Sequence, residues 1–214
     1  MDTKEIMDTT EKYYLPVFGR SPIALDHGEG PYLYDADGNK YTDFLAGIAV
    51  NALGYAYPPL VKAVSEQAGK IMHGSNLFYY GIQAKAAKQL CEVTTFDRVF
   101  FCNSGAEANE GAIKLARKYG HSKDPKKFKI ITAKDSFHGR TMETLTATGQ
   151  DHYHEGLNPL PEGFVYVPFG DLAAMEEAMD DDVCGVLLEP IQGEGGVRAA
   201  GRLFGKGPGP VQSP

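Results

Sequence analysis

The chain has 214 residues, 43% of them hydrophobic and 23% charged, and a formal net charge of −7. This is globular composition, long enough for a sizeable core. The acidic balance argues against a nucleic-acid partner, which would require clustered Lys and Arg. No apolar run nears the roughly 20 residues that span a bilayer, and the start lacks a signal-peptide pattern. Three cysteines without CxxC spacing indicate buried thiols, so we expect a cytoplasmic protein that binds neither nucleic acid nor membrane.

The first part of the chain predicts few regular elements. Residues 1–30 show little periodicity and many turn formers, so we expect a terminal arm with one short helix over residues 4–13. In residues 31–44, two short aromatic-rich runs flank an Asp-Gly pair, which predicts a β-hairpin. Helical spacing then predicts two helices, the first opened by a pair of prolines over residues 58–71 and the second over residues 82–93.

From residue 98 onward, short apolar runs alternate with helical patterns. Strands are expected over residues 99–102, 128–132, 164–167 and 183–188, and helices over 106–119 and from a cap at Asp171 past Ala178. Such alternation predicts an α/β fold with a mainly parallel sheet, whose ligands bind at the carboxyl ends of the strands. The last fourteen residues contain four Gly and three Pro and break this pattern.

The sharpest motif is the segment 103–110, which follows the first of these strands and opens a helix. A Ser-Gly turn at such a position leaves backbone N–H groups unpaired at the positive end of the helix, and this geometry holds a phosphate. Gly105 admits close approach of the anion, and Ser104 offers a hydroxyl donor. On spacing alone, a plain helix cap is equally open, with Ser104 as the N-cap and Glu107 completing a capping box.

Two more motifs follow strand ends. Residues 136–141 bring together an aromatic ring, an imidazole and a guanidinium: Phe137 is suited to stack on a planar ring and Arg140 to grip a carboxylate. For His138 a structural histidine is the favoured interpretation, and a general base is the alternative. The third motif, residues 188–196, places Glu189 and Glu194 among glycines, which fits either a plain loop or a site.

Residues 74–80 cluster exposed-looking aromatic side chains, which on their own indicate core or interface. His152 and His154 flank Tyr153 without a third ligand at metal spacing, so no metal site is expected. The three loops at strand ends supply an anion cradle, a stacking surface and fixed charges. A phosphorylated aromatic cofactor fits them better than a free nucleotide, because the patterns GxGxxG and GxxxxGK[ST] are missing from the first loop.

Together and in this order, the three loops resemble the signature loops of the class-III, pyridoxal-phosphate-dependent aminotransferases. Segment 45–54 matches as well, the likeness is strongest to acetylornithine-type members, and it covers roughly residues 14–200. The resemblance implies the large domain of fold-type I, truncated, in which helices cover both faces of a mainly parallel sheet, preceded by an arm and a hairpin of the small domain. Where the family usually has Gly-His-x-His-Pro, residues 54–58 read Gly-Tyr-Ala-Tyr-Pro, and little consequence is expected.

The resemblance assigns expected roles position by position. The implied cofactor is pyridoxal 5'-phosphate. Its phosphate would be bound at the helix start by Ser104, Gly105 and Ala106. Its ring would stack on Phe137, and Glu189 would be a supporting acid beneath it. Three residues would contact or lie near the substrate. Arg140 would bind its α-carboxylate, and Glu194 would pair with a substrate-site arginine. Tyr79 would lie near the substrate channel and the dimer interface.

The reaction that the resemblance implies moves an amino group from N-acetylornithine to 2-oxoglutarate in arginine biosynthesis. Substrates would be amino acids and 2-oxo acids, and the full-length enzyme a homodimer. An ornithine or 4-aminobutyrate aminotransferase is the alternative within the family, and a non-catalytic fragment is the alternative of another class.

The family's Asp that pairs with the pyridine nitrogen and its Schiff-base Lys have no match in this sequence. We therefore expect no catalytic residue in this chain and no transamination by it alone. The expected domains are an arm and hairpin over 1–57, the first half of the cofactor-binding domain over 58–200, and a tail outside the family pattern over 201–214.

Overall fold

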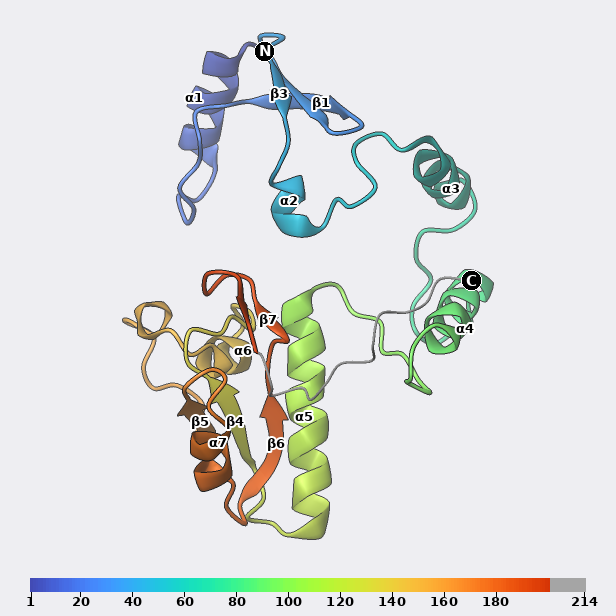
Figure 1. Cartoon of the computed structure of the whole chain (residues 1–214). Helices are drawn as coiled ribbons and strands as arrows, with labels where there is room; N and C mark the ends of the chain where they lie inside the picture. The colour runs from blue at the N-terminus through green and yellow to red at the C-terminus, as the bar shows by residue number, and fades with distance from the viewer. Residues whose placement is uncertain (201–214) are drawn as a thin grey trace. The chain divides into compact units, whose positions relative to one another are not determined.

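The computed structural model describes residues 1–200, so the tail expected over 201–214 lies outside the described residues. The chain forms two compact units, Met1–Ala84 and a second that begins at Lys85, and we describe each by itself (Figure 1). The domain boundary expected at residue 57 stays a prediction. In the described part of the chain, no helix is both long and apolar enough to cross a membrane.

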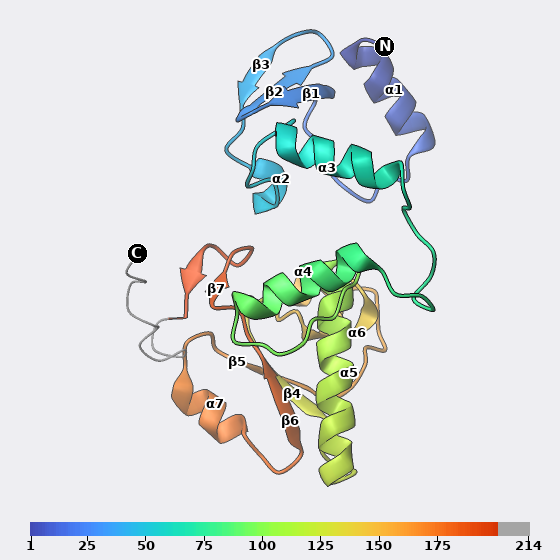
Figure 2. The ribbon, with the colours of Figure 1, turned by 90° about the vertical axis from the view of Figure 1, so that its right-hand side faces the viewer.

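The first unit contains a three-stranded antiparallel sheet (Figure 2). Its strands are β1 (Leu25–Glu29), β2 (Tyr32–Asp35) and β3 (Lys40–Thr42), in that order, and β2 with β3 is the predicted hairpin. The predicted N-terminal helix is α1 (Thr3–Tyr13), capped by the side chain of Asp2. Strand β1 was not predicted, because its sequence Leu-Asp-His-Gly-Glu offers no apolar alternation and only its partner β2 makes it a strand.

The hairpin turn is held by one buried carboxylate. Asp35 accepts hydrogen bonds from the backbone and side-chain amides of Asn39 at 2.8 and 2.9 Å and from Tyr41 Oη at 2.7 Å. These donors, the Asn39 side chain first, lower the pKa of Asp35 to about 2. The carboxylate therefore stays charged at neutral pH and adds side-chain hydrogen bonds to the backbone bonds between Asp35 and Asn39 and between Gly38 and Asp35.

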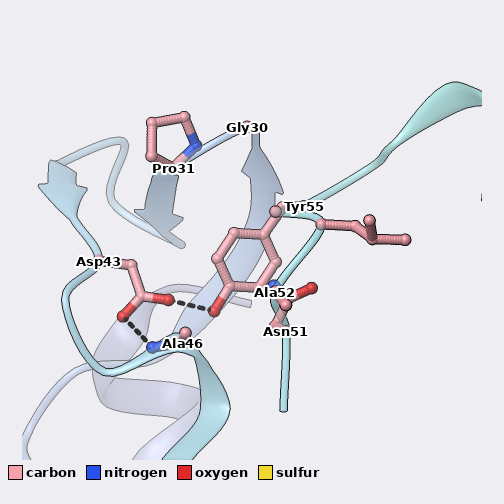
Figure 3. A pocket seen from close by; sticks show the side chains of 9 residues that line it. Gly30, Pro31, Asp43, Ala46, Asn51, Ala52 and Tyr55 are labelled. Atoms are coloured by element: carbon pink, nitrogen blue, oxygen red, sulfur yellow. Dashed lines mark hydrogen bonds between the residues drawn. The ribbon is translucent and has the colours of Figure 1, made fainter. Parts of the chain in front are cut away.

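Beyond β3 the backbone is strained, at the short helix α2 (Ala46–Ala49). Gly47 and its neighbours have positive φ, between 49° and 62°. Asp43 anchors this turn, because its carboxylate accepts from the backbone N–H of Ala46 at 3.0 Å and from Tyr55 Oη at 2.6 Å (Figure 3). Tyr55, where the family usually has histidine, thus has a structural part in this turn, whereas the sequence indicated only a helix opening.

Helices α3 (Pro58–Ala68) and α4 (Gly81–Glu92) match the two helices predicted for this stretch. Helix α3 begins at the proline pair, as expected, since proline fits the first turn. It ends at Ala68, three residues earlier than the predicted end at Ile71. The aromatic stretch before α4 is exposed as it looked in the sequence, with Phe78 68% accessible.

The second unit has a parallel sheet in the order β5-β4-β6. Its elements in chain order are α5 (Gly105–Lys123), β4 (Lys129–Ala133), α6 (Met142–Ala147), a 3-10 turn (Asp151–Tyr153), β5 (Phe164–Val167), α7 (Leu172–Ala178), β6 (Val183–Leu187), β7 (Ile191–Gln192) and β8 (Arg198–Ala199). The predicted α/β alternation and parallel pairing are confirmed. Helix α6 and the short β7–β8 pair were not predicted, because each is too short to show a period.

The core of this unit lies where α5 and α6 meet the sheet. Ile113 of α5, Ile130 of β4 and Ala147 of α6 are almost fully buried and form one cluster, against which Phe164 and Leu187 pack. The centre of β4 is apolar on both faces, as expected for a strand flanked on both sides by parallel neighbours.

The expectation of three buried thiols is wrong. Cys102 is exposed, and Cys91 and Cys184 are only partly buried. Cys184 lies on β6 beside the core cluster, and burial raises the pKa of its thiol. Cys91 and Cys102 lie outside the sheet, so packing between strands does not bury them.

The strand predicted over residues 99–102 is also wrong. This segment has no regular structure, and the side chain of Phe100 is 70% exposed. A strand needs a neighbour that satisfies its N–H and C=O groups. In the described residues, the parallel sheet consists of β5, β4 and β6, and residues 99–102 pair with none of these strands.

Candidate functional site

The three motifs that follow predicted strands lie at one end of the second unit. The N-terminus of α5 and the carboxyl end of β6 are at the same end of the sheet (Figure 1). Parallel strands end at a common edge, and a helix that crosses back between strands begins there as well. The loop that follows β4 contacts the start of α5, and the loop that follows β6 contacts the loop after β4.

The start of α5 is a capped helix N-terminus with open space beside it. Ser104 Oγ accepts from the Glu107 N–H at 3.2 Å, and Glu107 Oε2 accepts from the Asn103 N–H at 2.7 Å. This is a variant of the capping box, since the glutamate reaches one residue further back than the cap. The N–H groups of Gly105 and Ala106 come before the first intrahelical donor, and a Cβ at Gly105 would meet no heavy atom within 4 Å.

Hydrogen bonds fasten the loop after β4 to this helix start. Asn109 Nδ2 donates to the His138 carbonyl at 2.8 Å, and Thr141 Oγ1 donates to Glu110 Oε1 at 2.7 Å. Gly139 has φ 138°, and a Cβ there would lie 2.8 Å from the Cβ of Ala106. Only glycine lets the loop approach α5 this closely.

His138 is a buried structural residue of this loop. Its side chain is 4% exposed, and Nε2 lies 3.0 Å from Thr132 Oγ1 on β4. Burial lowers the pKa of the imidazole to about 4, so it is neutral at pH 7. The favoured structural interpretation of His138 agrees with this geometry, since the ring faces a threonine inside the protein.

Phe137, Arg140 and Tyr153 form an aromatic and cationic cluster. The rings of Phe137 and Tyr153 meet edge to face with centroids 5.9 Å apart. The guanidinium carbon of Arg140 lies 4.1 Å from the Tyr153 centroid and 5.6 Å from the Phe137 centroid. Both distances are within cation–π range, so the exposed guanidinium rests on aromatic faces.

The two acids of the loop after β6 contact this cluster differently. Glu189 is half-buried and accepts from the Phe137 N–H at 3.3 Å, and burial raises the pKa of its carboxyl group. Glu194 is exposed and accepts from Gln150 Nε2 at 2.5 Å and from Tyr153 Oη at 2.8 Å. These hydrogen bonds, that from Gln150 first, lower the pKa of Glu194.

The structure thus brings together seven of the eight predicted site residues in the second unit. Tyr79 belongs to the first unit, where its side chain is fully exposed, and its role stays a prediction. The hollow of about 320 Å³ in the first unit, shown in Figure 3, contains none of the predicted site residues.

Sequence reasoning missed the residues that hold the loops together: Asn109, Thr141, Gln150 and Tyr153. The signal for Asn109 was available, because it stands four residues after Gly105 and thus on the same face of the helix. In the sequence, Tyr153 stands out only as the neighbour of two histidines. A larger hollow, about 500 Å³, opens between Lys134 and the segment 150–152 beside this cluster.

The sequence of the chain matches one protein family over most of its length. The profile of the family described as aminotransferase class-III matches residues 16–207, most of the chain. The chain belongs to the class-III aminotransferases. The match reaches beyond Ala200, where the resemblance judged from the motifs ends.

Relatives within the class-III aminotransferases include two acetylornithine aminotransferases. The protein from Methanothermobacter thermautotrophicus is 50% identical over 197 residues, which are 92% of this chain and 49% of that protein. The protein from Caldanaerobacter subterraneus is 54% identical over 191 residues, 89% of this chain and 49% of that protein. The chain spans about half the length of the curated relatives it matches.

Solved structures of class-III aminotransferases confirm the fold-type I architecture. The ornithine aminotransferase from Toxoplasma gondii has a TM-score of 0.89 at 30% identity and covers 93% of this chain, which corresponds to 48% of that one. The N-acetylornithine aminotransferase from Stenotrophomonas maltophilia has a TM-score of 0.72 at 40% identity, and the match covers 89% of this chain and 46% of that one.

The residues present fit a phosphorylated, planar cofactor. The start of α5 offers two backbone N–H groups, a hydroxyl and open space above Gly105. Phe137, half-buried and beside the half-buried acid Glu189, lies in the loop fastened to that helix start. This donor set is suited to a phosphate monoester with an aromatic ring attached.

Proposed function

We propose that this chain forms the cofactor-binding half of an active site that uses pyridoxal 5'-phosphate to move an amino group from N-acetylornithine to 2-oxoglutarate, a step of arginine biosynthesis. The observation that carries the proposal is the linkage of three family motifs: the loop after β4 is bonded to the start of α5 on one side and to Glu189 of the loop after β6 on the other. Relatives about 50% identical to this chain are acetylornithine aminotransferases, and they support the choice of amino donor.

In this proposal the cofactor phosphate sits at the start of α5. Gly105 and Ala106 donate their backbone N–H groups and Ser104 its hydroxyl, and the helix dipole favours the phosphate charge. Phe137 packs against the cofactor ring. Glu189 lies below the ring as a half-buried acid, fixed by the Phe137 N–H. When bound, pyridoxal phosphate supplies an electron sink for amino-group transfer.

Arg140 binds the α-carboxylate of the substrate. Its guanidinium is exposed and held against two aromatic rings, and a planar donor fork of this kind pairs with a carboxylate through two parallel hydrogen bonds. His138 moves no proton in this scheme, because it is buried, neutral at pH 7 and bonded to Thr132.

An ornithine aminotransferase is the second candidate, because the Toxoplasma gondii enzyme matches this fold with a TM-score of 0.89. Its sequence identity of 30% is well below the 50% shared with acetylornithine aminotransferases. A substrate assay separates the two. We expect the complete gene product, loaded with pyridoxal phosphate, to form glutamate from 2-oxoglutarate with a higher kcat/KM for N-acetylornithine than for ornithine or 4-aminobutyrate. Preference for ornithine would establish the second candidate, and no glutamate from any donor would refute both.

The proposal extends to assembly and location. The full-length protein is a cytoplasmic homodimer in this proposal. The exposed apolar side chains on the turn at α2, including Phe44 at 94% and Val50 at 82% exposure, support the homodimer. Sedimentation velocity of the complete gene product measures the mass of the assembly. We expect twice the subunit mass, and a monomer at micromolar concentration would contradict the dimer.

A further inference from the structure

Arg140 and Glu194 are opposite charges in neighbouring loops, yet they do not pair. Among the ion pairs of the described residues, none includes either side chain within 4.0 Å. The residue between them is Tyr153, whose hydroxyl donates to Glu194 Oε1 at 2.8 Å and whose ring lies 4.1 Å from the guanidinium carbon of Arg140. One side chain therefore contacts both charges.

Both oxygens of Glu194 have neutral donors. Gln150 Nε2 donates to Oε2 at 2.5 Å and also to the Ser136 carbonyl at 2.9 Å, which ties the glutamate to the loop after β4. Tyr153 donates to Oε1, so the two oxygens of the carboxylate accept hydrogen bonds from two uncharged side chains, Gln150 and Tyr153. These two hydrogen bonds, that from Gln150 first, are the main causes of the lowered pKa of Glu194, and the charge of Arg140 contributes less.

From this arrangement we infer that Tyr153 is a positioning residue that keeps Arg140 available for a carboxylate ligand by holding Glu194 away from it. The inference rests on the proposed function, in which Arg140 binds the substrate carboxylate. The phenol satisfies one oxygen of the competing acid, and its ring lies under the guanidinium of Arg140, whose side chain stays exposed to solvent.

The two contacts of Tyr153 depend on different atoms, so they can be separated. Tyr153→Phe keeps the ring under Arg140 and removes only the hydrogen bond to Glu194. The freed carboxylate oxygen then pairs with the nearby guanidinium. An exposed ion pair of this kind is worth about 0.2–1 kcal/mol, which corresponds to up to about a fivefold change in the availability of Arg140. Glu194→Gln in addition removes the charge that competes.

The test is chemical labelling of Arg140, which needs neither cofactor nor turnover. The 214-residue chain is treated with phenylglyoxal, and the modification of the Arg140 peptide is followed over time by mass spectrometry. Tyr119→Phe is the matched control, since Tyr119 is an exposed phenol on α5. Circular dichroism shows whether each variant keeps its helices.

We expect Tyr153→Phe to slow labelling of Arg140 about threefold, the double variant Tyr153→Phe/Glu194→Gln to restore the rate, and Tyr119→Phe to leave it unchanged. Labelling of Tyr153→Phe at the wild-type rate, in a folded variant, overturns the inference. So does a double variant as slow as the single one, because the loss would then not come from the Glu194 charge.

A second arm separates this outcome from failure of the proposed function. In the wild-type chain, glutarate is added as a carboxylate probe during labelling. Protection of Arg140 by glutarate supports its role as a carboxylate binder. Without protection, the assignment of Arg140 under the proposed function fails, and with it the inference that Tyr153 serves that role. Slow labelling of Arg140 in Tyr153→Phe, together with protection of Arg140 by glutarate in the wild-type chain, supports both the inference and the role of Arg140 under the proposed function.

Discussion

Gly139 sets the distance between the loop after β4 and the start of α5. Its φ of 138° is a conformation that other residues adopt only with strain, and a Cβ there would lie 2.5 Å from Thr144 Oγ1 and 2.8 Å from Ala106 Cβ. We expect Gly139→Ala to lower the free energy of unfolding by about 3 kcal/mol, measured by urea denaturation.

The matched control is Gly105→Ala, one helix position from Ala106. A Cβ at Gly105 meets nothing within 4 Å, and its φ is not positive. Its unfolding free energy should stay within about 0.5 kcal/mol of wild type. Equal destabilisation by the two substitutions would show that the close approach at Gly139 is not what holds the loop.

His138 makes stability depend on pH. Its pKa is about 4 in the folded chain and about 6.5 in an unfolded one, so between these values the unfolded state binds more protons. The contribution is complete above pH 6.5 and is lost as the pH falls toward 4. Between pH 7 and pH 5 the loss is about 2 kcal/mol.

The measurement compares urea denaturation of wild type and His138→Gln at both pH values. The substitution removes the titrating group, so the variant should lose about 2 kcal/mol less than wild type over this interval. Identical pH dependence in the two proteins would mean that His138 is not neutral and buried.

Residue types alone predicted which side chains of the site are chemically able to bind a cofactor and a carboxylate. Phe137 and Arg140 were proposed this way, because few side chains stack on a ring or grip a carboxylate, whereas the role of Glu189 came from the family resemblance. Tyr153 and Gln150 were not found, since their importance comes from a loop that folds back onto Glu194, 41 and 44 residues away in sequence. Such long-range contacts leave no local pattern.

At the scale of elements, α5 and α7 begin with the same type of N-cap, a side-chain oxygen that accepts from the backbone N–H three residues later. Ser104 Oγ accepts from the Glu107 N–H at the start of α5, and Asp171 Oδ1 accepts from the Ala174 N–H at the start of α7. Loss of either cap costs about 1 kcal/mol. Only α5 begins at the proposed phosphate site.

We therefore expect Ser104→Ala and Asp171→Ala to lower the unfolding free energy by similar amounts and to differ in cofactor binding. Loss of a donor to a charged ligand should weaken pyridoxal phosphate binding about tenfold in Ser104→Ala. Asp171→Ala should bind as wild type does. Equilibrium dialysis measures both affinities, and equal weakening in the two variants would contradict the placement of the phosphate.

Helices whose apolar residues repeat over several turns were predicted well, as α4 and α5 demonstrate, and so were continuous apolar strands such as β5. Elements that are decided only by a neighbouring segment were not. Strand β1 exists because β2 lies beside it, and residues 99–102 remain irregular because the described sheet gives them no neighbour. An apolar run alone does not make a strand, because the backbone groups of a strand also need a paired neighbour.

At the scale of the whole chain, the proposed assignments predict binding without covalent attachment. The residues matched to the cofactor hold its phosphate and ring, and none of them is a lysine. Added pyridoxal phosphate should keep the absorbance of the free aldehyde, and borohydride treatment should leave no cofactor-derived mass on any lysine of the 214-residue chain. A visible absorbance shift with one labelled lysine would contradict this expectation.

The central claim is that the N-terminus of α5 binds the phosphate of pyridoxal phosphate. A crystal structure of the chain with this compound tests it most directly. The account predicts phosphate oxygens within hydrogen-bond distance of the Gly105 and Ala106 amides and of Ser104 Oγ, with the pyridine ring against Phe137. A well-ordered structure in which the phosphate lies elsewhere, and those amides face only water, would contradict it.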